Sequence, residues 1–182
     1  MAIRDWKIGT RQALGFGTVL VLLVAVLLLG LWSSVRMERA AAHAAELEKL
    51  ALVAEKWAAM ASKQVVRTEA AARFGADNPE IFEYFQRQIA ATRVRVDELQ
   101  KLVEEGIGAS GQAEQLARVK ALRQQQIAVR DEMLAALKAG DGARVEQLLS
   151  TRFQPAAKSY TDAQAALTES LAQEAESTIA QA

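Results

Sequence analysis

Cysteine is absent from this 182-residue sequence, and histidine occurs once, at His43. Without cysteine, disulfides and thiolate chemistry are excluded, and a single histidine cannot build a Cys/His zinc site. Aromatic residues make up only 5% of the chain, and proline occurs only at Pro79 and Pro155. Few prolines and aromatics, with abundant alanine and leucine, favour long helices over sheets. The formal net charge is zero, so the composition does not suggest a nucleic-acid-binding protein.

One stretch near the N-terminus lacks charge altogether, and it spans residues 12–35. Within it, residues 13–32 are almost purely apolar, and about 20 apolar residues are needed to cross a bilayer as a helix. A cleaved signal peptide has a shorter apolar region that ends at a small-x-small site. We therefore expect an uncleaved transmembrane helix over residues 12–33.

The charges that flank this stretch predict its orientation. Arg4, Lys7 and Arg11 precede it, and basic residues concentrate on the cytoplasmic side of a membrane. We therefore expect a cytoplasmic N-terminal segment at residues 1–11 and a periplasmic domain at residues 34–182.

Helix-breaking residues divide the part after the apolar stretch into four helices. The first is predicted to end near Phe74, where Asn78 is a good N-cap for the next helix and Pro79 suits its first position. Further breaks lie in two glycine-containing segments, at residues 106–111, with Ser110 as a possible cap, and at residues 140–142. A kink is expected at Pro155 in the fourth helix.

These connections are short, and short connections make consecutive helices antiparallel neighbours. The predicted fold class is therefore all-α, with an N-terminal transmembrane helix that continues into an antiparallel up-down-up-down four-helix bundle. The first and fourth helices outside the membrane have similar lengths, which brings the C-terminal end back towards the membrane. A second transmembrane helix is expected beyond that point, so we expect the sequence to be a fragment or a truncated reading frame.

A spacing of three and four residues predicts which side of each helix faces the bundle core. The predicted core-facing lines are, in chain order, Leu50, Val53, Trp57, Met60, Gln64, Arg67, Ala71 and Phe74; Phe82, Phe85, Ile89, Thr92, Val96, Leu99 and Val103; Leu116, Val119, Arg123, Gln126, Arg130, Met133 and Leu137; and Leu149, Phe153, Ala156, Tyr160, Ala163 and Leu167.

Three arginines, Arg67, Arg123 and Arg130, fall on these lines, and no Asp or Glu falls there beside them. A buried arginine keeps its proton and needs an anion. Arg123 and Arg130 are two turns apart, about 10.5 Å along the helix axis, and guanidinium groups suit carboxylates. These arginines predict a site for an organic anion, which the hydroxyls of Thr92 and Tyr160 could orient.

The same pattern has a second interpretation. The third helix also has a second possible core-facing line, through Val119, Leu122, Gln126, Val129 and Met133. If this line faces the core, Arg123 and Arg130 lie on the flank of the helix. Arg67 could pair with Glu69, and arginines at bundle edges usually extend into water. Periodicity alone therefore leaves both an anion site and solvated or salt-bridged arginines open.

Several short segments resemble a known family. Residues 3–11, I-R-D-W-K-I-G-T-R, and residues 14–17, L-G-F-G, resemble the N-terminus of methyl-accepting chemotaxis proteins of proteobacterial type. Residues 65–68, 128–130 and 155–160 resemble, in the same order, the four-helix-bundle sensor domain of these proteins. The resemblance implies a homodimeric periplasmic sensor in the bacterial inner membrane, and it implies a coupling protein and a histidine kinase as partners of a full-length receptor.

Some similar sensors bind small organic acids such as malate or citrate. Their contacts are an arginine on the first helix, a threonine on the second, two arginines on the third and a tyrosine on the fourth, which implies Arg67, Thr92, Arg123, Arg130 and Tyr160 here. Gln126 stands between the two arginines, where such relatives often have a tyrosine. These six residues form the predicted ligand-binding set.

The leading hypothesis is therefore the sensor of a chemotaxis receptor that binds a di- or tricarboxylate-like anion. The same sensor attached to a histidine kinase or a cyclase, or a non-sensory membrane-anchored helical scaffold, are the alternatives. The sequence contains no nucleophile–base arrangement, no paired acids on a core-facing line and no set of metal ligands. We therefore expect neither enzymatic activity nor a cofactor.

Overall fold

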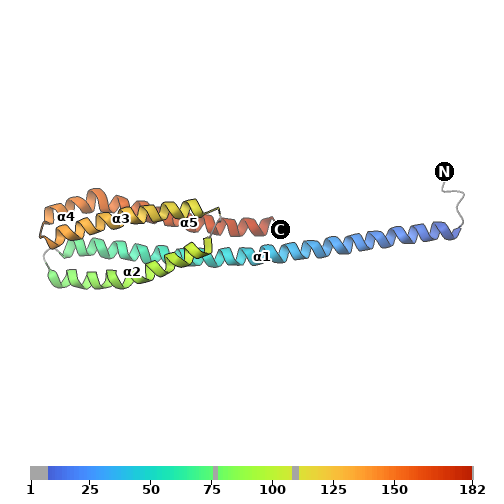
Figure 1. The fold of residues 1–182 in the computed structure, drawn as a ribbon, viewed down its shortest axis with the longest axis horizontal. Helices are drawn as coiled ribbons and strands as arrows, with labels where there is room; N and C mark the ends of the chain where they lie inside the picture. Colours follow the sequence, from blue (N-terminus) through green and yellow to red (C-terminus); the bar gives the residue numbers. More distant parts are fainter. Residues whose placement is uncertain (1–7, 76–77, 108–110, 182) are drawn as a thin grey trace.

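The computed structural model describes residues 8–75, 78–107 and 111–181. In these residues the chain is helical apart from short connections, and the elements are α1 (Ile8–Phe74), α2 (Pro79–Ile107), α3 (Ala113–Lys138), α4 (Gly142–Leu148), the π-helical turn η2 (Leu149–Phe153) and α5 (Gln154–Ala180). The C-terminal half of α1, together with α2, α3 and the α4–η2–α5 segment, forms a four-helix bundle (Figure 1). The predicted all-α fold is confirmed.

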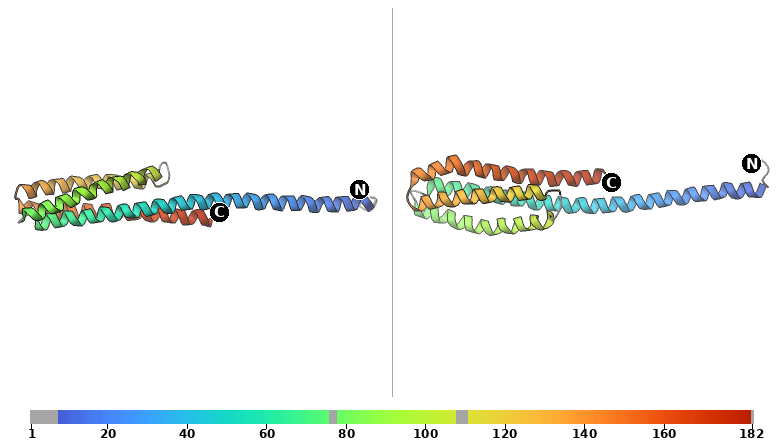
Figure 2. Two further views of the ribbon diagram at one scale, coloured as in Figure 1. Left: turned by 90° about the horizontal axis from the view of Figure 1, so that it is seen from below. Right: turned by 45° about the horizontal axis from the view of Figure 1, so that its top comes forward.

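The N-terminal half of α1 extends beyond the bundle and has no neighbouring helix (Figures 1 and 2). Its large apolar side chains, such as Leu20, Val24 and Leu28, are exposed. This is the one helix in the described part of the chain that is long and apolar enough to cross a membrane. The burial of α1 side chains begins at Ala44, and α5 ends beside the middle of α1 (Figure 2).

The bundle consists of two helix pairs joined by a close contact between α1 and α5. Helix α2 packs mainly against α1, and α3 packs mainly against α5, whereas direct contact between α2 and α3 is sparse. Small residues of α1 and α5, including Ala54, Ala61 and Ala157, are buried, and small side chains let neighbouring helix backbones approach each other. The side of the bundle between α2 and α3 is therefore its most open side.

The helix ends follow the predicted turn chemistry where the structure describes them. The Asn78 side-chain oxygen accepts hydrogen bonds from the backbone N–H groups of Glu80 and Ile81, at 3.1 and 3.2 Å. Asp141 caps α4 in the same way, because its carboxylate accepts from the Arg144 N–H at 3.0 Å. The predicted cap at Asn78 and the predicted break at residues 140–142 are thus confirmed, whereas the cap predicted at Ser110 lies outside the described residues.

The predicted fourth helix contains an irregularity immediately before Pro155. The backbone N–H of Gln154 bonds to the Leu149 carbonyl five residues earlier, which closes the π-helical turn η2. Proline has no N–H to continue the ordinary ladder of hydrogen bonds, and its ring crowds the preceding turn. A π-helical turn widens the backbone at this point, so it accommodates Pro155 within an otherwise continuous helical segment.

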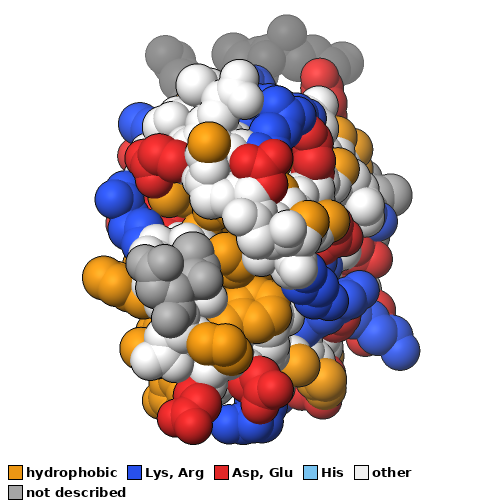
Figure 3. All heavy atoms as spheres, turned by 90° about the vertical axis from the view of Figure 1, so that its left-hand side faces the viewer, with side chains coloured by type: hydrophobic (Ala, Val, Ile, Leu, Met, Phe, Trp, Pro, Cys, Tyr) orange, Lys and Arg blue, Asp and Glu red, His pale blue; other side chains and the backbone are white. Residues whose placement is uncertain are grey.

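The core divides into two clusters along the bundle. One lies nearer the extended part of α1 and includes Trp57, Val96, Val119 and Leu167. The other lies towards the far end, and its members surround Met133, Leu148 and Phe153. The far end also carries an apolar hollow of about 430 Å³, lined by Phe74, Glu80, Ile81, Tyr84 and Phe85, and Figure 3 shows apolar side chains gathered among charged ones on this face.

The predicted core-facing lines of the first and last helices were partly wrong. In α1 the buried line passes through Ala54, Ala61 and Thr68 instead of the neighbouring positions Val53, Met60 and Arg67. Phe74, at the end of the predicted line, is 61% exposed. The fourth helix shows the same one-residue shift, from Ala156 and Ala163 to Ala157 and Gln164. The lines predicted for the second and third helices are confirmed for most of their members.

Candidate functional site

The six residues predicted to bind a ligand fall into separate groups. Arg67 on α1 donates hydrogen bonds to the Thr92 hydroxyl and, at 3.4 Å, to the Gln88 carbonyl on α2. The Thr92 hydroxyl itself donates to the same carbonyl at 2.8 Å. Arg67 is half-buried at the edge of the core, so this group joins two helices by hydrogen bonds without a carboxylate.

Arg123 on α3 reaches across to α2. Its guanidinium donates to the Asp97 carboxylate and to the Gln100 side-chain oxygen, and its side chain is only 11% exposed. Asp97 also lies 3.9 Å from the Nε atom of Arg93. Of the two interpretations that the sequence left open, the salt-bridged one therefore describes Arg123.

Arg130 is the most deeply buried of the three arginines, with a side chain 8% exposed. Its Nε and Nη2 atoms donate to one oxygen of Asp131, at 2.9 and 2.7 Å. The salt-bridged interpretation therefore describes Arg130 as well. Asp97 and Asp131 sit off the predicted core-facing lines with exposed side chains, so they reach the arginines from the flank of the bundle.

Gln126 and Tyr160 lie in the core, as does Gln164 one turn after Tyr160. The Tyr160 hydroxyl, the Trp57 indole N–H and both amide atoms of Gln164 are buried and lack a hydrogen-bond partner in the described part of the chain. A buried polar group without a partner destabilises the fold by about 1–3 kcal/mol. Polar groups without partners therefore lie along the α1–α5 contact.

Burial raises the pKa of Tyr160 to about 12, although the positive charge of Arg123 acts in the opposite direction. In an unfolded chain the ordinary tyrosine pKa is about 10. Between these values the unfolded chain loses the proton while the folded chain keeps it, so the free energy of unfolding falls as pH rises. Below the unfolded pKa this contribution to stability is complete.

We expect the free energy of unfolding to fall by about 1 kcal/mol more in the wild type than in Tyr160→Phe between about pH 9 and about pH 11. The variant has no phenol to ionise, whereas all other alkaline titrations are common to both proteins. Urea unfolding of both proteins at the two pH values measures the difference. Equal losses in the two proteins would show that Tyr160 ionises in the folded bundle as easily as in the unfolded chain.

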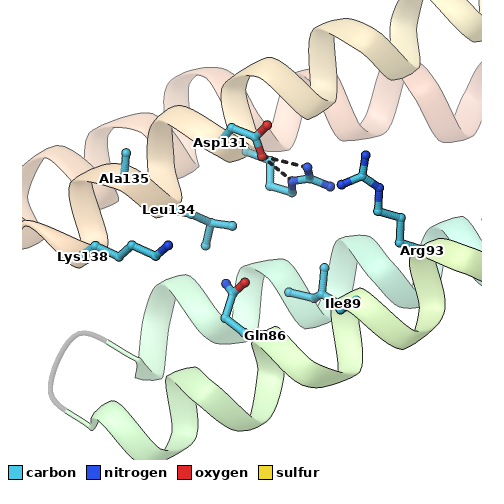
Figure 4. Close-up of a pocket in the computed structure, with 9 residues that line it drawn as sticks. Gln86, Ile89, Arg93, Asp131, Leu134, Ala135 and Lys138 are labelled. Atoms are coloured by element: carbon cyan, nitrogen blue, oxygen red, sulfur yellow. Dashed lines mark hydrogen bonds and ion pairs between the residues drawn. The ribbon is translucent and has the colours of Figure 1, made fainter.

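A groove of about 390 Å³ lies between α2 and α3, where the helices make little direct contact. Its lining combines cationic, apolar and amide side chains, and consists of Gln86, Ile89, Ala90, Arg93, Arg130, Asp131, Leu134, Ala135 and Lys138. Figure 4 shows Arg93 reaching from α2 towards the Asp131 end of the groove, and Lys138 extending along α3 from the other end. Three cations face a single carboxylate in this lining, so the groove favours anions.

Of the six predicted residues, Arg130 lines this groove, and the sequence reasoning missed its companions Gln86, Arg93 and Lys138. A signal for them exists in the sequence. Arg130, Leu134 and Lys138 follow each other at intervals of four on α3, and such residues share one helix face. Gln86, Ile89 and Arg93 do the same on α2 at intervals of three and four.

No group of three or more His, Asp or Glu side chains that could hold a metal ion occurs within the described ranges. The lining of the groove offers charge pairing and hydrogen bonding to an anion, from guanidinium, ammonium and amide donors.

Comparison with known proteins gives one family. A family model described as a four helix bundle sensory module for signal transduction matches residues 5–182. No curated protein matches the chain. The matching family is one of signalling modules and is not an enzyme family, and together with the apolar N-terminal part of α1 it indicates a membrane location. Because the match extends over nearly the whole sequence and agrees with the helical bundle observed, the chain belongs to the four-helix-bundle sensory modules of chemotaxis receptors.

Proposed function

We propose that this chain is the sensor of a bacterial chemotaxis receptor and that it binds a small organic anion outside the inner membrane. One observation carries the proposal, namely the excess of positive charge on the open side of the bundle. Arg93 and Lys138 stand there with the largely buried Arg123 and Arg130, and the nearby carboxylates of Asp97 and Asp131 offset only part of this charge. An anion bound there would neutralise the remainder.

The position of α1 in the membrane is part of this proposal. Residues 12–33 cross the bilayer, residues 1–11 lie in the cytoplasm, and residues 34–182 form the periplasmic domain. The Arg36 guanidinium lies 5.0 Å from the centre of the Trp32 ring, and such aromatic and cationic side chains favour the membrane interface. This pair supports a membrane boundary close to Trp32.

The sensor acts as a homodimer in this proposal, and helix α1 supplies a suitable surface. Leu52 and Val66 are exposed on α1, and their separation of two heptads places them on the same face of the helix. A second copy of α1 packed along this face would bury both side chains. Transmission then requires ligand binding to displace α5 relative to α1 by about 1–2 Å, which is the scale of known helix shifts at interfaces.

The proposal is tested by the thermal stability of the full chain in lipid nanodiscs with a panel of mono-, di- and tricarboxylates. A ligand at 100 times its Kd adds about 2.7 kcal/mol of stability, so the melting temperature of the bundle should rise for at least one acid. The uncharged amide of the same acid serves as the matched control and should have no effect. A flat response to every carboxylate would overturn the proposal.

A further inference from the structure

We infer that the groove between α2 and α3 is the anion site, and that it selects an elongated dicarboxylate with an apolar centre. This inference rests on the proposed function and gives it a location and a ligand class. The groove differs from the predicted set, since Arg67, Thr92 and Tyr160 belong to other groups of side chains. Its selectivity follows from the order of side chains along the two facing helices.

One end of the groove holds two guanidinium groups. Arg130 is held in place by Asp131, which occupies its Nε and Nη2 atoms and leaves Nη1 available. Arg93 approaches the same end from α2 (Figure 4). A side chain that is already oriented loses little entropy when it binds a ligand. This end of the groove is therefore preorganised to bind one carboxylate.

The other end holds Lys138, which is eight residues after Arg130 on α3. At 1.5 Å per residue the two positions are about 12 Å apart along the helix. A compact dicarboxylate bound by the arginines would leave Lys138 without a partner. A ligand that engages both ends must therefore be elongated and carry an anionic group at each end.

The middle of the groove is apolar except for one amide. Ile89, Ala90, Leu134 and Ala135 line it, which suits a methylene chain or a ring. The amide nitrogen of Gln86 is buried without a hydrogen-bond partner in the described residues, and Figure 4 shows this side chain directed into the groove. This unmet buried donor can bond to a carboxylate oxygen of the ligand.

Isothermal titration calorimetry of the full chain in lipid nanodiscs tests the ligand class, with suberate as the elongated probe. Malonate is the compact dicarboxylate control, and octanoate has the same chain length as suberate but a single carboxylate. We expect suberate to bind at least about tenfold more tightly than either control, since only suberate meets both charged ends. Equal or tighter binding of malonate would overturn the inference.

Three variants test the location. Arg93→Ala and Lys138→Ala should each weaken suberate binding about tenfold, and Lys138→Ala should also remove the preference for suberate over octanoate. Asp131→Asn should strengthen binding about threefold, because it removes the one carboxylate of the groove. Arg93 and Lys138 have exposed positions, and Asp131→Asn keeps a side-chain oxygen that can accept the hydrogen bonds of Arg130. The fold should therefore tolerate these replacements, which the circular dichroism spectrum checks.

Arg87→Ala and Lys101→Ala are the matched controls, since both residues are exposed on α2 and neither lines the groove. They should leave suberate binding unchanged. If neither Arg93→Ala nor Lys138→Ala changes suberate binding, the groove is not the anion site. The proposed anion-sensing function would still stand in that case. Absence of binding by any carboxylate would overturn the proposed function together with this inference.

Discussion

Trp57→Ala should lower the free energy of unfolding of the bundle by about 3–5 kcal/mol. Trp57 is fully buried and belongs to the core cluster formed by all the long helices. Its removal takes the largest side chain out of this cluster, and the surrounding helices cannot collapse fully into the cavity. Most small domains have only about 5–15 kcal/mol of total stability, so the loss would be a large fraction of the whole.

Urea unfolding of residues 36–182 measures this loss, since the buried side chains that the structure describes all lie between Ala44 and Ala175. Val94→Ala is the control, because Val94 is an apolar residue of α2 that is 61% exposed and lies outside the proposed dimer face, and it should change stability by less than about 0.5 kcal/mol. A loss below about 1 kcal/mol for Trp57→Ala would mean that the tryptophan does not pack in the core as described.

Gln164→Leu should have the opposite effect and stabilise the bundle by about 1–3 kcal/mol. Gln164 is 1% exposed, and neither its amide oxygen nor its amide nitrogen has a hydrogen-bond partner among the described residues. Leucine has a similar volume and carries no polar atoms, so it fills the same space without the cost of burying an unpaired amide.

Gln173→Leu is the matched control, because the same substitution is made at an exposed position of the same helix. It should change the free energy of unfolding by less than about 0.5 kcal/mol. Destabilisation by Gln164→Leu would instead indicate that ordered water satisfies the buried amide, since water bonded to buried polar groups is costly to remove. Stabilisation would mean that the natural glutamine makes the bundle less stable than leucine does at the contact between α1 and α5.

That contact is where the sequence was hardest to interpret. Ala54, Ala61 and Thr68 form the buried line of α1, yet alanine and threonine give a weak hydrophobic signal beside Val53 and Met60. Thr68 tolerates burial because its hydroxyl donates to the Gln64 carbonyl at 2.9 Å. Small residues are common where two helix backbones approach closely. Only the position of α5 shows that the line of small residues on α1, and not the neighbouring line through Val53 and Met60, is the buried one.

The charged residues illustrate the same limit. Periodicity correctly placed Arg130 in a largely buried position, but it could not identify Asp97 and Asp131 as ion-pair partners. A long arginine side chain can reach a carboxylate on the flank of its own helix or on the next helix. The pairing therefore depends on how the helices are rotated and spaced, which a single sequence does not specify.

The sequence by itself determined the class of structure. Glycine, proline and capping residues such as Asn78 act locally, and a long uncharged apolar run predicts a membrane-spanning helix. Tertiary structure alone decided which side of α1 meets α5, which carboxylates accompany Arg123 and Arg130, and where α2 and α3 leave a groove. The physical reason is that helix ends depend on the backbone within a few residues, whereas packing depends on side chains that are distant in sequence and compete for the same space.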